Sequence, residues 1–251
     1  MEKDQSLTKK RFFELCERAE KSSRFTFTGF LNMEEQSLLL SMKKELPLPF
    51  TLFGGMEDCE RRVARFGSED AFGYAEPFPI ACVGISAVAA RFGAELSHRD
   101  VLGSILGLGV ERSILGDIAV KGESAFAFCL ASMAGYVAEN LTRVGRQGVK
   151  CALLEHPPEG PLYSLSEQKI QISSERIDAV VAKAYNLSRE DSAELFLKEK
   201  VYIDAALCKN SSRTLKEGEI VSVRGFGRFV YRGTTGTTKK GRLNAIIEKY
   251  V

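Results

Sequence analysis

Positive side chains gather near the end of this 251-residue chain in patterns that suit contact with RNA. Arg224, Arg228 and Arg232 recur every four residues, which places them on one face of a strand if that strand is regular. Like charges aligned on one face repel each other, so a purely structural role for all three is hard to support. We expect this row to contact RNA, and a solvated protein face is the alternative.

Lys209, Asn210 and Arg213 belong to a polar loop whose donors suit phosphate and 2′-hydroxyl oxygens. Arg189 is expected in the first turn of a helix, where a cation opposes the helix dipole at a cost of about 0.3–1 kcal/mol. That cost suggests an anionic partner such as phosphate. Pairing with Asp178 would explain Arg189 equally well.

Lys198 and Lys200 are expected at the end of the same helix, where positive charge is favourable in any case. They are candidates for RNA contact, with a strong structural alternative. Residues 233–241 are rich in Thr, Gly and Lys, and we expect this tail to be mobile in the free protein. Its lysines and Arg242 would add nonspecific phosphate contacts.

The charge of the chain is unevenly distributed. Residues 174–251 hold 15 Lys and Arg against 10 Asp and Glu, a net charge of +5, whereas residues 1–173 hold 20 against 23, a net charge of −3. A basic end on a mildly acidic body favours nucleic-acid binding. A surface for anionic lipid or for an acidic protein has the same charge pattern.

Periodicity and capping predict the elements that position these residues. Ser188 is expected to cap the second helix of the basic region, with Asp191 completing a carboxylate version of the capping box. The two helices and three strands predicted here cover Arg176–Ala184, Arg189–Lys198, Val201–Ile203, Ile220–Val223 and Phe229–Tyr231.

Proline-rich segments divide the chain, because proline disfavours a continuing helix or strand. Pro77 and Pro79 indicate one boundary, and three prolines within residues 156–161 indicate a linker. We therefore predict an α+β protein of three domains. They are a small N-terminal α+β domain (1–75), a split-βαβ, RRM-like middle domain (76–156) and, after a linker (157–173), a C-terminal RNA-binding domain (174–251).

The middle region is predicted to follow the order β-α-β-β-α-β, which many RNA-binding domains share. Such domains bind single-stranded RNA through aromatic residues on the sheet. Phe126 and Phe128 alternate on one predicted strand but lack the expected motif of glycines and aromatics around them, which favours core positions. The predicted elements are Ile80–Phe92, His98–Leu106, Asp117–Val120, Ala125–Leu130, Ala131–Val144 and Val149–Leu154.

The sequence indicates no catalytic or metal-binding set. His98 and Asp100 fall in the first turn of a predicted helix, and no nucleophile accompanies them. The six cysteines stand far apart without a C-x-x-C pair and are expected to be buried thiols. We therefore expect no catalytic residue, metal, cofactor or small-molecule substrate.

Membrane insertion is also disfavoured by the sequence. The N-terminal segment is charged throughout, and no apolar run reaches the 18 residues or so that a membrane-spanning helix requires. We expect a cytoplasmic protein with no membrane partner.

Residues 175–224 resemble the S-four domain, a small RNA-binding fold named after a protein of the small ribosomal subunit. The resemblance implies that Arg176, Ser188, Arg189 and the loop cations face RNA. The segments that carry it are Arg176-Ile-Asp178, Ser188-Arg189, Leu195, Val201-Tyr-Ile-Asp204 and Leu215-Lys-Glu-Gly-Glu-Ile-Val-Ser-Val223.

The chain departs from the S-four pattern at three places. Ser192 stands where the family usually has alanine, and Glu199 stands where it has a glycine before the strand. Asp204-Ala205 replaces the usual Asn-Gly turn. These departures concern the shape of the loops rather than the presence of the domain.

Further segments resemble the YlmH-type RNA-binding proteins of bacteria and plastids, so that the likeness covers nearly the whole chain. They are Phe53-Gly-Gly55, Glu60-Arg-Arg62, Leu96-Ser-His-Arg-Asp-Val-Leu-Gly103, Leu106-Gly-Leu-Gly-Val-Glu-Arg112, Leu115-Gly-Asp-Ile118 and Asn140-Leu-Thr-Arg-Val-Gly145.

This resemblance implies a noncatalytic factor that binds ribosomal RNA or transfer RNA on the large ribosomal subunit. The family is associated with rescue of stalled subunits that carry peptidyl-tRNA, a form of ribosome quality control, and its genes often lie near cell-division genes. Two alternatives remain open. The chain could be an RNA-modifying enzyme or its accessory, because S-four domains are often attached to such enzymes, or an interaction protein linked to cell division.

Overall fold

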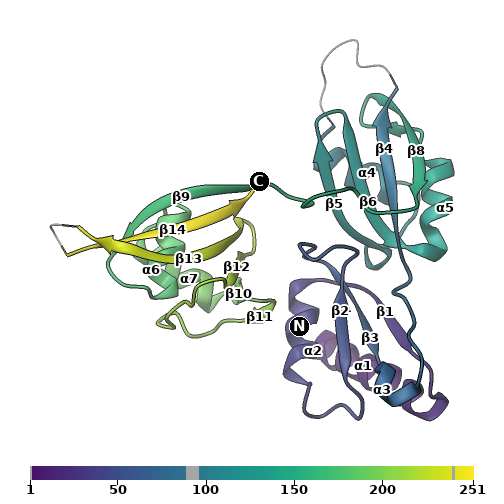
Figure 1. Cartoon of the computed structure of the whole chain (residues 1–251), viewed down its shortest axis with the longest axis horizontal. Helices are drawn as coiled ribbons and strands as arrows, with labels where there is room; N and C mark the ends of the chain where they lie inside the picture. The colour runs from purple at the N-terminus through teal and green to yellow at the C-terminus, as the bar shows by residue number, and fades with distance from the viewer. Residues whose placement is uncertain (1, 89–95, 239–240) are drawn as a thin grey trace. The chain divides into compact units, whose positions relative to one another are not determined.

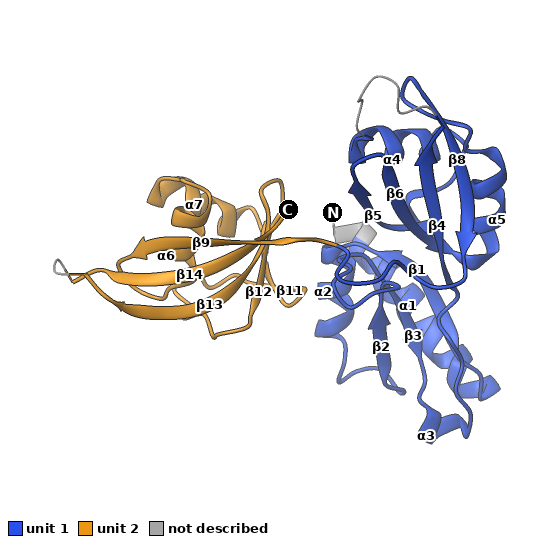
Figure 2. Cartoon of the chain, turned by 45° about the horizontal axis from the view of Figure 1, so that its top comes forward, with its two compact units in different colours: residues 1–162 blue, residues 163–251 orange. Residues whose placement is uncertain are grey.

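The computed structural model describes residues 2–88, 96–238 and 241–251. The chain divides into two compact units, residues 1–162 and residues 163–251 (Figures 1 and 2). The first unit contains two antiparallel sheets and the second contains one, with helices beside each of them. The predicted α+β class is confirmed. The prediction of three domains stays a prediction: the first two predicted domains contain one sheet each, and strand β9 of the third sheet lies before the predicted C-terminal domain.

The N-terminal sheet has the strand order β1-β3-β2, with antiparallel pairing throughout. Helix α1 packs on it through Phe12, Leu15, Cys16 and Ala19, which are spaced three to four residues apart and buried. The elements of this region are α1 (Glu2–Ser22), β1 (Thr26–Leu31), α2 (Met33–Ser41), β2 (Phe50–Phe53), β3 (Arg62–Phe66) and α3 (Glu69–Phe72).

The middle sheet has the strand order β5-β6-β4-β8-β7. Strands β5, β6, β4 and β8 form the sheet of a split-βαβ unit. Its first and third strands along the chain, β4 and β6, lie together at the centre. Val83, Ile85, Ala125 and Ala127 face the helices and form a buried core with them. The elements are β4 (Ile80–Ala87), α4 (His98–Leu106), η1 (Arg112–Ile114), β5 (Leu115–Lys121), β6 (Ser124–Leu130), α5 (Ala131–Asn140), β7 (Arg143–Val144) and β8 (Gln147–Leu154).

Two predicted elements of the middle region differ from the structure by more than two residues at one end. Helix α5 ends at Asn140 rather than at Val144, because Arg143 and Val144 pair with Gly148 and Gln147 in a hairpin. Gly145, with a φ of +56°, supplies the left-handed conformation that the turn requires. The strand predicted over Ile80–Phe92 is β4 as far as Ala87, and its end lies outside the described residues.

A buried carboxylate joins the two sheets of the first unit. Asp117 on β5 is 6% exposed and accepts hydrogen bonds from the backbone N–H groups of Glu60 (2.7 Å) and Arg61 (2.8 Å). The Arg61 guanidinium donates to the carbonyls of Phe30, Arg112 and Leu115. Burial, together with the nearby Arg61, lowers the pKa of Arg112 to about 10. Asp117 thus offsets the charge of two half-buried guanidinium groups.

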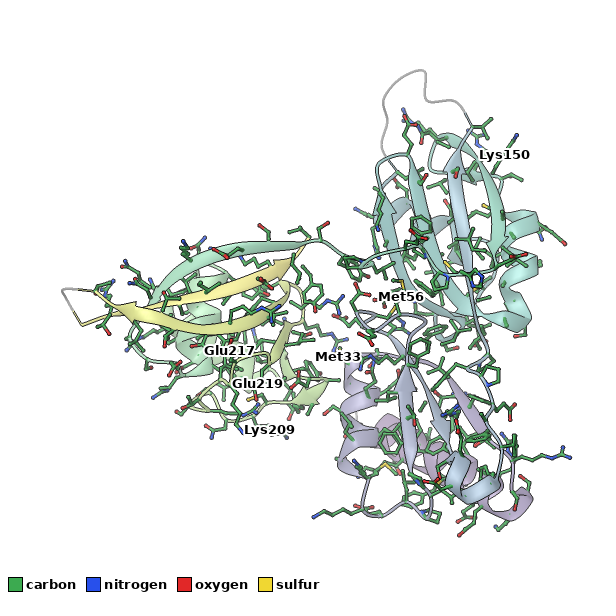
Figure 3. All side chains as sticks on the ribbon, in the orientation of Figure 1. Met33, Met56, Lys150, Lys209, Glu217 and Glu219 are labelled. Atoms are coloured by element: carbon green, nitrogen blue, oxygen red, sulfur yellow. The ribbon has the colours of Figure 1, made fainter. Side chains whose placement is uncertain are left out.

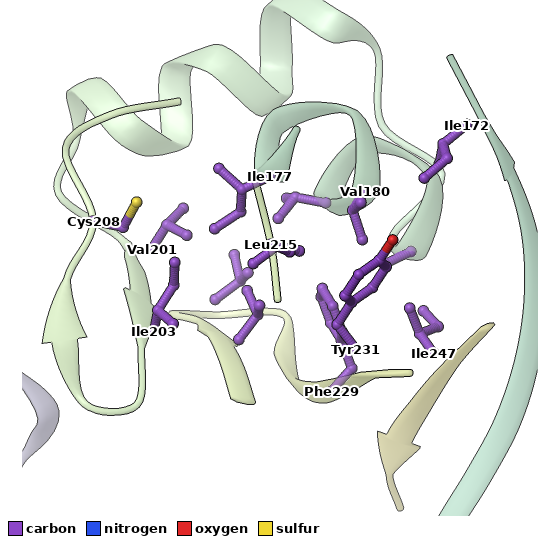
Figure 4. Packing of buried hydrophobic residues seen from close by; sticks show 14 of the residues in the cluster. Ile172, Ile177, Val180, Val201, Ile203, Cys208, Leu215, Phe229, Tyr231 and Ile247 are labelled. Atoms are coloured by element: carbon purple, nitrogen blue, oxygen red, sulfur yellow. The ribbon is translucent and has the colours of Figure 1, made fainter. Parts of the chain in front are cut away.

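The second unit is a six-stranded sheet with the order β11-β10-β12-β13-β14-β9 and two helices. Buried side chains of α6 and α7 interlock with those of the sheet, among them Ile177, Val180, Phe229 and Tyr231 (Figure 4). The elements are β9 (Leu165–Ile172), α6 (Ile177–Ala184), α7 (Arg189–Leu197), β10 (Val201–Ile203), β11 (Ala206–Leu207), β12 (Ile220–Val223), β13 (Gly227–Thr237) and β14 (Leu243–Tyr250).

Two segments that were expected to lack regular structure are strands. The predicted linker, residues 157–173, contains β9, which pairs with β14 over eight residues. The tail expected to be mobile, residues 233–241, begins inside β13, which continues to Thr237 and pairs with β14. Lys239 and Lys240 lie outside the described residues. The local sequence pattern does not predict either strand, because both are stabilised by pairing with β14, the last strand of the chain.

Two of the three departures from the S-four pattern fall where the backbone is left-handed. Glu199 has a φ of +52°, and Asp204 and Ala205 have φ values of +47° and +68° in the two-residue turn between β10 and β11. A glycine would fit these positions without steric cost. The Asp204 carboxylate accepts a hydrogen bond from the Ile220 N–H, which offsets the cost at that residue.

All six cysteines are free thiols, and five of them are buried. Burial raises the pKa values of Cys129 and Cys151 to about 11, so both thiols are protonated at neutral pH. In the part of the chain that the structure describes, no helix is long and apolar enough to cross a membrane.

Replacing Asp117 by Asn should destabilise the first unit by about 2–4 kcal/mol, because two half-buried guanidinium groups would lose their counter-charge. Urea unfolding of the full chain, followed by circular dichroism, measures the effect. Asp100→Asn is the matched control, since the Asp100 carboxylate is exposed and only helps cap α4. Equal unfolding curves for the two variants would show that the charge of Asp117 is unimportant.

Ala205→Gly should stabilise the second unit by roughly 1 kcal/mol. The change removes about 1–2 kcal/mol of strain from a left-handed backbone conformation. The greater conformational freedom of glycine in the unfolded chain offsets part of this stabilisation. Asp204→Gly relieves the same type of strain but deletes the hydrogen bond to Ile220, so it should give little or no gain. Thermal unfolding of both variants checks this, and a lower melting temperature for Ala205→Gly would contradict it.

Candidate RNA-binding surface

The beginning of α6 and the loop after β11 are bound together through the backbone. The Ile177 N–H donates to the Arg213 carbonyl (2.8 Å), and the Asp178 N–H donates to the Ser211 carbonyl (3.2 Å). An isolated β-bridge joins Arg176 to Thr214. These hydrogen bonds bring Arg176, Asn210 and Arg213, three residues predicted to contact RNA, close together. They also occupy the helix N–H groups, so any anion here must be bound by side chains.

Helix α7 lies against the same end of α6. The Ser192 hydroxyl, which is completely buried, donates to the Asp178 carbonyl at 2.9 Å. This bond explains why serine is accepted where the S-four pattern has alanine. In the first turn of α7, the Arg189 guanidinium donates to the hydroxyl of Ser173 at 3.0 Å. Arg189 therefore joins the group formed by α6 and the loop.

The structure excludes one of the two explanations offered for Arg189, a pairing with Asp178, and RNA contact by Arg189 stays a prediction. The Asp178 carboxylate that could have neutralised it accepts from the Arg176 guanidinium instead, at 2.6 Å. Within the described ranges, no carboxylate lies within salt-bridge distance of Arg189. An exposed cation that opposes the helix dipole without a counter-charge is a favourable contact for a phosphate group.

Ser188 has a structural role that the sequence predicted. Its hydroxyl accepts from the Asp191 N–H at 3.0 Å and bonds the Asp191 carboxylate at 2.6 Å. Both hydrogen-bonding functions of the hydroxyl are therefore used to begin α7. RNA contact by Ser188 stays a prediction.

Two candidate lysines form exposed ion pairs. Lys198 pairs with Glu194, and Lys209 pairs with Glu199, each at 2.7 Å. The Lys209 side chain is 72% exposed and lies on the loop after β11 (Figure 3). Exposed pairs of this kind contribute at most about 1 kcal/mol, so a phosphate could replace the carboxylate at little cost.

Arg213 forms a more protected pair. Its guanidinium lies 2.6 Å from the carboxylate of Glu219, whose side chain is only 11% exposed. The same carboxylate also accepts from the Lys216 N–H at 2.9 Å. This arrangement holds the loop before β12 in place. Arg213 thus has a structural duty in addition to any contact with RNA.

The row of three arginines does not lie on one strand, so the expected regular strand is wrong. Strand β12 ends at Val223 and β13 begins at Gly227, which leaves Arg224 in the turn between them. Its N–H donates to the Lys200 carbonyl at 2.9 Å, so these two candidate contacts are adjacent.

Arg228 and Arg232 have partners inside the sheet. The Arg228 guanidinium lies over the ring of Tyr250, 3.9 Å from its centroid, and 4.7 Å from that of Tyr163. Arg232 pairs with Glu248 at 2.7 Å. These aromatic and carboxylate partners reduce the repulsion between the arginines. RNA is therefore not required to offset that repulsion, as the sequence had suggested.

The middle sheet offers little aromatic surface. Phe128 is 1% exposed, and its ring lies where a Cβ on Gly55 would clash with it, so the loop before β3 covers it closely. Phe126 is half-buried, with the Lys121 ammonium 6.0 Å from its ring. Phe128 is buried, as expected from the lack of the glycine and aromatic motif of RNA-binding strands.

Basic residues gather instead beside the β7–β8 hairpin of the middle region. Arg143, Arg146 and Lys150 are exposed on or next to this hairpin, and Figure 3 shows Lys150 on β8. The Gly145 N–H donates to the hydroxyl of Ser104 on α4, which also bears the exposed Arg99. These residues were not predicted as contacts, because a helix predicted through Val144 stands where the hairpin brings them together.

His98 and Asp100, the pair considered for acid–base chemistry, lie at the start of α4. His98 is the first residue of α4, and Asp100 hydrogen-bonds the capping hydroxyl of Ser97 at 2.7 Å. Among residues 2–88, 96–238 and 241–251, no group of three or more His, Cys, Asp or Glu side chains is placed to hold a metal ion.

Comparison with known proteins links the chain to the YlmH proteins. Residues 75–157 match the family described as "Putative RNA-binding domain in YlmH". The chain is similar to "Ribosome-associated protein quality control protein P2" of Bacillus subtilis, with 27% identity over 227 residues, which cover 90% of this chain and 88% of the relative.

The fold has a solved counterpart as well. The "Cell division protein ylmH from Streptococcus pneumoniae" superposes with a TM-score of 0.50 at 22% identity, over 60% of this chain and 91% of the other. The predicted resemblance to YlmH-type proteins is confirmed. The family match also falls on the middle region, which the sequence analysis had not assigned to RNA binding.

Arg189→Ala should leave the melting temperature unchanged, because no carboxylate depends on this side chain for its charge. Arg213→Ala should lower it by several degrees, since it leaves the shielded Glu219 carboxylate without its cation. Differential scanning fluorimetry of the full chain compares the two. A marked loss of stability in Arg189→Ala would show that its bond to Ser173 is structural, which would weaken its assignment to RNA.

Proposed function

We propose that this chain is a noncatalytic RNA-binding factor that binds ribosomal RNA or transfer RNA on the large ribosomal subunit and serves the rescue of stalled translation. The observation that carries the proposal is the cluster at the start of α6 and α7. There, Arg189 has no carboxylate within salt-bridge distance among the described residues, Arg176 pairs with the half-buried Asp178, and Lys209 pairs with the exposed Glu199. Such a surface suits the phosphates of structured RNA.

The name of the Bacillus subtilis relative places that protein on ribosomes and in quality control. Its alignment with 90% of this chain supports the same class of function here. The match to a YlmH RNA-binding family at residues 75–157 supports a second RNA contact in the first unit. The exposed arginines beside the β7–β8 hairpin are the side chains we assign to it.

Two weak contacts on one chain would act together. When one unit is bound, the tether holds the other near the same RNA at a high effective concentration, which raises the overall affinity without new contacts. This favours a large folded RNA that offers two sites over a short oligonucleotide. A ribosomal subunit has this property, and phosphate contacts make its binding dependent on shape and salt rather than on base sequence.

Binding to purified large ribosomal subunits should depend steeply on salt. If about five phosphates are neutralised, the logarithm of the affinity should fall with the logarithm of salt concentration at a slope of about −3 to −5. Arg189→Ala should weaken binding and reduce the magnitude of the slope by about one. Co-sedimentation in sucrose gradients at several salt concentrations measures both quantities.

Lys169→Ala is the matched control, because Lys169 is an exposed cation on β9, on the face of the strand opposite the buried Ile170, which packs toward α6. It should bind like the wild type. A slope near zero for the wild type would exclude phosphate-driven binding. Equal losses in both variants would show that only the net charge matters and not the surface around Arg189.

A further inference from the structure

The turn between β12 and β13 presents an aromatic ring. Its sequence is Arg224-Gly-Phe-Gly-Arg228, and the Phe226 N–H donates to the Val223 carbonyl at 2.9 Å. Gly225, with a φ of +90°, makes the turn possible, since the third position of this type of turn requires a left-handed residue. Phe226 follows it and is 44% exposed. The turn itself requires no phenyl group at that position.

Phe226 is supported by other aromatic residues. Its ring lies 5.5 Å from that of Tyr185, at the end of α6, and Tyr185 lies 6.0 Å from the fully buried Phe229. The Lys249 ammonium lies 5.0 Å from the Tyr185 ring and donates to the Ala184 carbonyl. Contacts on several sides thus fix Tyr185, so Phe226 packs on a rigid side chain. Stacking of a nucleobase on Phe226 would therefore cost little side-chain entropy.

Cations lie beside this ring. Arg224 is exposed in the same turn, and its N–H bonds the carbonyl of Lys200, a half-exposed lysine. Arg189 follows Tyr185 by four residues, so their Cα atoms are at most about 14 Å apart. An aromatic face with phosphate-binding groups on either side is the usual construction of a site for unpaired nucleotides.

We infer that Phe226, supported by Tyr185, is a stacking site for one unpaired base of the bound RNA, with Arg224 and Lys200 contacting the adjoining phosphates. The inference rests on the proposed function and adds to it the kind of RNA recognised. The second unit would bind at a loop or bulge rather than along a continuous duplex. Stacking on a single ring accepts any of the four bases.

The test uses two RNAs that share one stem. One stem is closed by a loop of unpaired adenines, and the other continues as a plain duplex. Phe226→Leu keeps an apolar cover on Tyr185 but removes the aromatic face. It should weaken binding of the full chain to the looped RNA by about 5- to 100-fold and leave binding to the duplex unchanged. The salt dependence should also stay the same, because no charge is removed.

A spectroscopic signal tests the contact directly. The chain contains no tryptophan, so Phe226→Trp introduces a single one. Its fluorescence should be quenched by the looped RNA, whereas Tyr74→Trp, at a position 40% exposed and outside both proposed RNA contacts, should not respond. Thermal unfolding of Phe226→Leu shows whether the phenyl group only protects the core.

The possible outcomes are distinct. Selective loss of looped RNA by Phe226→Leu, with quenching of Phe226→Trp, supports the stacking site. If the wild type binds both RNAs and Phe226→Leu binds them equally well, the stacking site is excluded and the proposed function stands. If the wild type binds neither RNA and no ribosomal subunit at any salt concentration, the proposed function itself fails.

Discussion

Helices α6 and α7 carry the candidate surface of the second unit, and neither is long enough to be stable on its own. They contain eight and nine residues, whereas isolated helices shorter than about 12–15 residues are marginal in water. Their conformation therefore depends on burying Ile177, Val180 and Phe196 against the sheet. Each cation on this surface is held by a core that is itself formed largely by strands β10 to β14.

The same dependence explains which cations are available to RNA. Arg228 and Arg232 extend from β13, where cross-strand neighbours on β14 supply Tyr250 and Glu248 as partners. Arg189 extends from the first turn of α7, where the only carboxylate that sequence reasoning could pair with it is bound to Arg176. Availability of a cation is thus decided by what its neighbours bind, not by its position in a basic region.

The fold could be predicted from the sequence wherever a local signal existed. Strands β10 and β12 and helix α4 have the predicted bounds, and Ser188 caps its helix as expected. Strands β9 and β14 have no comparable signal, because they are stabilised by pairing with each other across 70 residues or more. For the same reason the predicted linker and mobile tail contain strands.

The sequence by itself determined the α+β class, the likeness to YlmH-type proteins, and the concentration of positive charge near the C-terminus. Only the tertiary structure decided the use of each charge. It removed Arg224 from the strand that carries Arg228, left Arg189 without a counter-charge among the described residues, and placed Phe226 on Tyr185. The physical reason is that charge and aromatic content are properties of single residues, whereas pairing and exposure depend on contacts between residues distant in the chain.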